Sequence, residues 1–303
     1  MKQIFFLIVI LPLSVFSQTS IVQDKSGETS LNFSNNKTVL FNSGDASIGA
    51  GFSFSNVTPK KNNGLETFWG WAVKLKSNDG ISTLLDGYDF MPRFTLGVFK
   101  GRAMKSSSKS SSNSIYYGTD IGNSVFNLLS QQTLNKLEKT SFFNWRIKLG
   151  FNRLGAWGKS TTLFGISSEF GSYKNLDDLT AVERYKSSID NSSTPSTIVV
   201  SNKKSGFSGD YKEGNMLKIN MDYLVFPTCL KGRVGLGGYF RGGLGGDFSR
   251  QNLGVGCFLG KEGAPDKIVL GLVYQINDVF NQLKEEPSFQ KRTGISITAG
   301  YSF

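Results

Sequence analysis

Basic side chains recur at alternate positions in several stretches of this sequence, and few acidic residues accompany them. In FNWRIKLGF (143–151), for example, Arg146 and Lys148 alternate with apolar residues. The basic members of such stretches are Lys74, Arg93, Arg146, Lys148, Lys218, Arg233 and Arg241, and the acidic members are Glu169 and Asp222. Side chains of this kind, gathered on one side of a sheet, would attract anions and repel cations.

The same residue types argue against catalysis. The chain contains no histidine, the usual general base of hydrolytic sites. Asp177 and Asp178 begin a stretch with helical spacing, where acids ordinarily cap a helix. Two cysteines far apart in the sequence and no Asp-rich calcium loop leave no metal site to expect. We therefore expect no enzymatic activity, no metal and no cofactor.

The element that would hold these side chains is a β-strand with one apolar and one polar face. In the carboxyl-terminal GISITAGYSF, Ile295, Ile297 and Tyr301 alternate with small or polar residues. Similar alternation recurs in ten stretches, which are 46–54, 69–75, 92–98, 143–151, 164–170, 217–225, 234–240, 253–259, 268–276 and 295–303. Abundant glycine and aromatic residues also favour strands over helices.

The amino terminus predicts export. Lys2 precedes an apolar run, and small residues before Gln18 suit a signal peptidase, so residues 1–17 are predicted to be a cleaved signal peptide. A retained membrane anchor is the alternative, but Pro12 interrupts the run, which is shorter than the roughly 20 residues of a spanning helix. Residues 44–303 then form the main domain. Residues 18–43 are predicted to be a separate amino-terminal segment that is either periplasmic or plugs the lumen of that domain.

We predict that 44–303 is an all-β, transmembrane, antiparallel up-and-down β-barrel of about ten strands. In lipid, only a closed barrel lets every strand pair all of its backbone hydrogen-bonding groups. Twelve strands would result if residues 30–41 added a hairpin. A soluble β-sandwich also alternates, but its strands average about 5–6 residues, shorter than several stretches here. The longest linkers, 101–141 and 174–213, are predicted to be extracellular loops, with short amphipathic helices at 121–139 and 175–189.

The chain resembles the outer-membrane β-barrel proteins of Gram-negative bacteria. Ser296, Tyr301 and Phe303 match the assembly signal in the last strand of that family, whereas Thr298 stands where glycine is usual. The Ser-Gln cleavage boundary resembles that of secreted proteins of the Bacteroidota. The resemblance implies an outer-membrane location, contact with membrane lipid and lipopolysaccharide, and insertion by the barrel-assembly machinery.

Two functions agree with these features. The first is a scaffold or accessory subunit of an outer-membrane complex, with a narrow or filled lumen and a protein partner at 101–141 and 174–213. The second is a small, anion-preferring pore for passive transport of solutes. Inward glycines such as Gly235 and Gly254 could leave a channel or make room for residues 18–43. The net charge of +11 fits contact with lipopolysaccharide, and nothing in the pattern indicates nucleic-acid binding.

Overall fold

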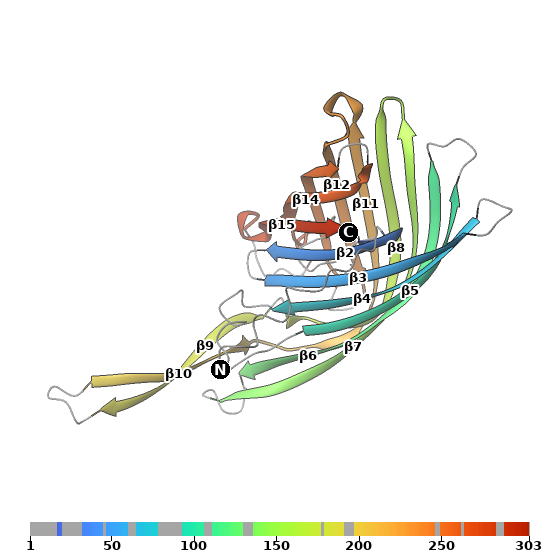
Figure 1. Ribbon diagram of the computed structural model, residues 1–303. Coiled ribbons are helices and arrows are strands. Elements are labelled where there is room, and N and C mark those ends of the chain that lie inside the picture. The colour runs from blue at the N-terminus through green and yellow to red at the C-terminus, as the bar shows by residue number, and fades with distance from the viewer. Residues whose placement is uncertain are drawn as a thin grey trace, which may run out of the picture.

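The computed structural model describes residues 17–19, 32–44, 47–59, 65–77, 93–105, 111–129, 136–176, 179–190, 197–245, 249–261, 264–282 and 288–302. Nearly all of them lie in β-strands of one large, curved sheet (Figure 1). Over these ranges no helix is both long enough and apolar enough to cross a membrane.

The strands are β1 (Ser17–Thr19), β2 (Asn32–Gly44), β3 (Ser47–Pro59), β4 (Leu65–Ser77), β5 (Arg93–Lys105), β6 (Ser112–Leu129), β7 (Leu137–Trp157), β8 (Ser160–Lys174), β9 (Thr180–Asp190), β10 (Thr197–Ser208), β11 (Glu213–Pro227), β12 (Val234–Leu244), β13 (Gln251–Lys261), β14 (Ala264–Ile276) and β15 (Thr293–Ser302). Two short 3-10 turns, η2 (Thr228–Leu230) and η4 (Gln290–Arg292), precede β12 and β15. The predicted all-β, antiparallel barrel fold is confirmed.

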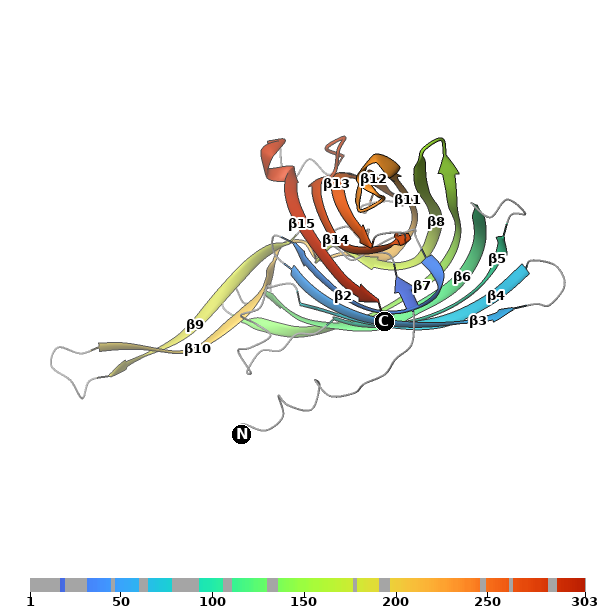
Figure 2. The ribbon, with the colours of Figure 1, turned by 45° about the horizontal axis from the view of Figure 1, so that its top comes forward.

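Antiparallel pairing links the strands into a ring. The order around it is β2, β3, β4, β5, β6, β7, β8, β11, β12, β13, β14 and β15, and β15 pairs again with β2. The β15–β2 contact is the shortest of the ring, running from Ile297–Ser43 to Ser302–Thr38. Figure 2 shows how the sheet curls so that β2 and β15 lie side by side. The pairing follows chain order except at β8, whose neighbour is β11.

Alternation along each strand gives the sheet two different faces. On β7, Phe143, Ile147 and Leu149 are exposed, with Ile147 at 59%. Asn144 and Gly150, on the opposite face of the same strand, are buried. Because successive side chains point to opposite faces, this pattern puts the apolar residues outside the ring and the polar residues inside it.

The two ends of the ring differ in the length of their connections. At one end, which we call the short-turn end, residues 158–159 join β7 to β8 and residues 228–233 join β11 to β12. At the other, the long-loop end, residues 175–212 separate β8 from β11 and residues 277–292 separate β14 from β15. This is the asymmetry of a bacterial outer-membrane barrel, whose longer loops are extracellular.

The long connection between β8 and β11 contains a β-hairpin outside the ring. Strands β9 and β10 pair with each other and extend away from the sheet (Figures 1 and 2). At the base of the hairpin, Phe207 of β10 pairs with Leu128 of β6. Phe207 also joins the buried cluster of Phe126, Phe142 and Leu176, which fixes the base to β6 and β7.

Two predictions about the strands need correction. Over the described residues the ring has twelve strands, which was the alternative count, but the additional ones are β2 and β6, not a hairpin at 30–41. Residues 32–43 therefore lie in the sheet and are not a separate amino-terminal segment. The predicted signal peptide lies outside the described residues except for Ser17, which belongs to β1.

The prediction for the two large loops was partly wrong. Residues 101–141 are not a loop, since they include the end of β5, all of β6 and the start of β7. The helix predicted at 121–139 is wrong, because 121–129 and 137–139 are strand. Phe126 and Asn127, on opposite faces of β6, are both buried there. Because both faces of the strand are covered, the alternation of apolar and polar residues that marks a strand is absent. The helix predicted at 175–189 is also wrong, because Thr180–Asp190 pairs with β10 as strand β9.

Candidate polar site on the inner face

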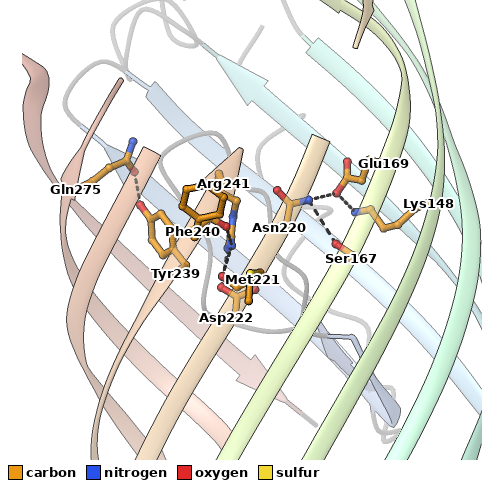
Figure 3. A network of polar contacts seen from close by, with 10 residues as sticks. All are labelled: Lys148, Ser167, Glu169, Asn220, Met221, Asp222, Tyr239, Phe240, Arg241 and Gln275. Atoms are coloured by element: carbon orange, nitrogen blue, oxygen red, sulfur yellow. Dashed lines mark hydrogen bonds and ion pairs between the residues drawn. The ribbon is translucent and has the colours of Figure 1, made fainter. Parts of the chain in front are cut away.

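A network of polar side chains crosses the inner face from β7 to β14 (Figure 3). We call it the inner polar network; its members are Lys148, Ser167, Glu169, Asn220, Asp222, Tyr239, Arg241 and Gln275. They come from β7, β8, β11, β12 and β14, which lie side by side in the ring apart from β13 between the last two.

Glu169 of β8 is the first centre of this network. Its Oε1 accepts a hydrogen bond from Asn220 Nδ2 at 2.7 Å and lies 2.9 Å from Lys148 Nζ. Its Oε2 lies 3.6 Å from Arg146 Nη1. The Glu169 side chain is fully buried, while those of Lys148 and Arg146 are 19% and 21% exposed. Register explains the contact, because Lys148 and Glu169 are direct cross-strand partners.

Asp222 and Arg241 form the second centre, and both side chains are fully buried. Arg241 Nη2 donates to Asp222 Oδ1 at 2.7 Å. Arg241 Nη1 donates to the carbonyl oxygens of Met221 at 2.9 Å and Phe240 at 3.0 Å, and the guanidinium lies 4.5 Å from the Tyr239 ring centroid. A buried charge is tolerated when it is paired and hydrogen-bonded, as Arg241 is here through both of its terminal nitrogens.

Two tyrosines each connect three adjacent strands. The ring of Tyr239 (β12) lies against Gly254 (β13), and its hydroxyl donates to Gln275 Oε1 (β14). These three residues are in register with one another across the three strands.

Tyr116 of β6 repeats this arrangement with β7 and β8. Its ring lies against Gly150 of β7, and its hydroxyl hydrogen-bonds with Ser167 of β8. These residues too are in register. Gly150 and Gly254 are required between each tyrosine and its partner, because a Cβ at either position would overlap the aromatic ring of the tyrosine. Gly254 and Gly235, the latter against Phe226, are therefore covered by aromatic rings and do not leave a channel at their positions.

Apolar side chains fill the inner face nearer the short-turn end. One buried cluster consists of Leu163, Leu224, Phe226, Tyr239, Phe258, Ile268 and Val273. A second consists of Phe68, Ala103 and Tyr116, with Phe99 packed against it. Phe68, Leu163, Leu224, Phe226 and Phe258 are all 0% exposed. Over these strands the inner face is closely packed.

Toward the long-loop end the inner face becomes basic. Lys74 of β4 lies within electrostatic range of Arg146, Lys148, Asp120 and Glu169. Lys218 and Arg146 lie 5.8 Å and 5.5 Å from the centroid of the Tyr173 ring. We call Lys74, Arg146, Lys148 and Lys218 the basic layer; its positive charge is partly balanced by Asp120 and Glu169 and would attract anions.

The structure brings together most of the predicted lumen residues. Seven of them lie on the inner face in the contacts given above, namely Lys74, Arg146, Lys148, Lys218, Arg241, Glu169 and Asp222. Arg93 begins β5, with Lys76 and Ser124 as its cross-strand partners. Arg233 is different: it lies in the turn before β12 and is exposed, so it is not part of the packed inner face.

Residues of the predicted assembly signal lie in and beyond β15. Ser296 is buried on its inner face. Tyr301 pairs with Val39 of β2, whereas Phe303 lies outside the described residues.

Sequence reasoning missed several members of the site. Asp120 and Tyr116 were assigned to a loop, and Asn220, Tyr239 and Gln275 carry no charge to mark them. Tyr239 and Gln275 could have been found only from register, because the contact depends on which residues face each other across three strands. Across the described ranges no three His, Cys, Asp or Glu residues are grouped so that they could hold a metal ion.

The comparisons with known proteins concern the fold alone. No family model matches the chain, and neither does any curated protein. Among solved structures, the β domain of the Bordetella autotransporter BrkA is similar with a TM-score of 0.43 and 9% identity, over 88% of this chain and 98% of that one. The translocator domain of autotransporter NalP from Neisseria meningitidis gives 0.40 and 11%, over 88% of each chain. The Pseudomonas putida toluene transporter TodX gives 0.31 and 9%, over 95% of this chain and 74% of that one.

Proposed function

We propose that this protein is a non-enzymatic, integral outer-membrane β-barrel that acts as a scaffold or accessory subunit of an outer-membrane complex. The observation that carries the proposal is the packed inner face, where the two apolar clusters and the Asp222–Arg241 pair exclude water. A barrel filled in this way serves through its surfaces and not through its lumen. The absence of histidine from the sequence supports a non-enzymatic role.

The outer face supports the membrane location. On β7 the outward residues from Phe143 to Phe151 are apolar, and exposed Lys139 and Arg153 flank them. Nine residues span about 30 Å of strand, or about 23 Å of thickness at a tilt of about 40°, close to the usual apolar band of about 25 Å. On the same outer face of β3 and β4, the Phe54 ring is tilted against Trp69, with 5.7 Å between ring centroids, and stacked on Trp71, with 6.1 Å.

Ile147 lies at the middle of this apolar band, and Ile147→Arg tests whether the band faces lipid. We expect the change to lower the free energy of unfolding in vesicles by about 2–4 kcal/mol, the cost of a basic residue at mid-bilayer. Ser141→Arg, on the same face of β7 but at the edge of the band, should cost at most about 1 kcal/mol. Equal effects of the two changes would argue against a bilayer around this face.

The long-loop end provides the surfaces for a scaffold. If the longer connections are extracellular, the β9–β10 hairpin extends from the cell surface side. Its base is fixed to the ring by the buried cluster around Phe207, which positions the hairpin for a protein partner. Residues 293–302, as the last strand of the ring, remain our candidate for recognition by the barrel-assembly machinery.

Conductance separates this proposal from its alternative. The purified protein, refolded and placed in a planar bilayer under a salt gradient, should show no discrete conductance steps. Its folded state would be verified by the shift in gel mobility on heating. A steady, stepwise current from the folded protein would overturn the filled-lumen proposal.

The alternative is a small anion-preferring pore, and the basic layer favours it. If conductance steps occur, their reversal potential should indicate anion preference. Arg146→Gln combined with Lys218→Gln should then reduce that preference, because both residues lie beside Tyr173 in the basic layer. The matched control is Lys136→Gln with Lys139→Gln, two exposed lysines at the start of β7.

A further inference from the structure

The outer face of β5, β6 and β7 carries basic residues where its apolar band ends. On β5 the outward residues Phe94, Leu96 and Val98 are followed by exposed Lys100 and Arg102. These two residues lie toward the short-turn end of the strand, which continues to Lys105.

Aromatic residues flank Lys100 on both neighbouring strands. Its cross-strand partners are Trp69 of β4 and Tyr117 of β6. The two aromatic side chains are 46% and 57% exposed. Aromatic side chains of this kind gather at membrane interfaces, where an apolar ring and a polar edge are both accommodated.

Arg153 of β7 extends the basic surface across β6. It is exposed and directly opposite Asn113, while Arg102 is opposite Ile115 on the same strand. Arg102 and Arg153 are thus two strands apart and offset by two residues along the strand, so their Cα atoms are separated by about 12 Å. Lys100 and Arg102 are separated by about 7 Å along one strand. All three cations therefore border the same small area of the outer face.

We infer that Lys100, Arg102 and Arg153 bind the phosphate of anionic phospholipid headgroups at the short-turn end of the barrel. The apolar band supplies the surface for the acyl chains, and the cations lie beyond it at headgroup depth. Arginine donates two parallel hydrogen bonds to a phosphate, and lysine adds a compact positive charge. This inference rests on the proposed membrane location and names the lipid class that this surface takes.

The test compares lipids next to two different tryptophans. Variants that keep only Trp69 or only Trp145 are refolded into phosphatidylcholine vesicles that contain phosphatidylglycerol, with bromine on the acyl chains of one lipid or the other. Quenching by the brominated lipid then reports its local enrichment. Trp145 is opposite Ile121, within the apolar band, and serves as the matched control site.

Next to Trp69 we expect phosphatidylglycerol to be preferred about three- to fivefold over phosphatidylcholine. The preference should fall to about one in the triple variant Lys100→Gln/Arg102→Gln/Arg153→Gln. It should persist in Lys136→Gln/Lys139→Gln, which removes two charges at the opposite end of β7. With the three cations in place, it should also weaken when sodium chloride is raised from about 0.05 M to about 1 M, because salt screens exposed charges.

Equal quenching by the two lipids at Trp69, or an equal preference at Trp145, would overturn the inference. So would a preference that survives in the triple variant. Inorganic phosphate added at constant ionic strength should leave the preference unchanged, and competition by it would indicate a site for free phosphate instead. If the protein does not insert into vesicles at all, the proposed membrane location itself fails, which is distinct from insertion without lipid preference.

Discussion

Replacing Arg241 by methionine should lower the free energy of unfolding by about 3–5 kcal/mol, the largest effect we expect from a single substitution. The change leaves the fully buried carboxyl of Asp222 without the guanidinium that lies 2.7 Å from it. It also leaves the carbonyl oxygens of Met221 and Phe240 without the donor that both use. The measurement is equilibrium unfolding by urea of the protein folded in vesicles.

A double variant distinguishes the cost of leaving Asp222 without its partner from the cost of replacing Arg241 itself. Arg241→Met combined with Asp222→Leu removes both charges, so most of the lost stability should return. Arg233→Met is the matched control, because Arg233 is exposed in the turn before β12, and it should cost less than about 1 kcal/mol. An Arg241→Met protein as stable as the unaltered one would contradict the role assigned to this buried pair.

Gly150→Ala should destabilise the barrel by about 1–3 kcal/mol, although it adds only one methyl group. A Cβ at Gly150 would lie 2.2 Å from Cζ of Tyr116, so the ring would have to move. That movement would also break the hydrogen bond between the Tyr116 hydroxyl and Ser167. Gly254→Ala should behave in the same way, because its Cβ would lie 2.3 Å from Cζ of Tyr239. Urea unfolding in vesicles measures both.

Gly155 provides the control for this experiment. It lies on β7 like Gly150, but the atoms nearest to a methyl group added there would be 3.8 Å away, so Gly155→Ala should have little effect. In a Tyr116→Ala background, Gly150→Ala should cost less than in the unaltered protein, because the ring that it displaces is absent. If the cost were the same in both backgrounds, contact with the tyrosine ring would not be its cause.

The two predicted helices show where sequence patterns mislead. In residues 121–129 the apolar side chains follow helical spacing, yet the segment is the end of β6. Phe126 and Phe142 are covered there by Leu176 and Phe207 of the long connection to β11. When a strand end is covered on both faces, its period of two disappears, and a local pattern cannot separate it from a helix.

The sequence alone determined the class of fold, the two faces of the sheet and the basic character of the inner one. These features follow from the alternation of side chains along each strand, which is local and visible as a period of two. Hence Arg146, Lys148 and Glu169 were assigned to one face before any pairing was known.

Only the tertiary structure decided the partners. That Lys148 is opposite Glu169, that Arg241 reaches Asp222, and that Tyr239 crosses Gly254 to Gln275 depend on the register between strands. Register depends on the turn that joins two strands and on which faces are buried together, so the period of two along a single strand does not contain it. The β9–β10 hairpin also depends on pairing between strands, because β9 and β10 are stabilised mainly by their hydrogen bonds to each other.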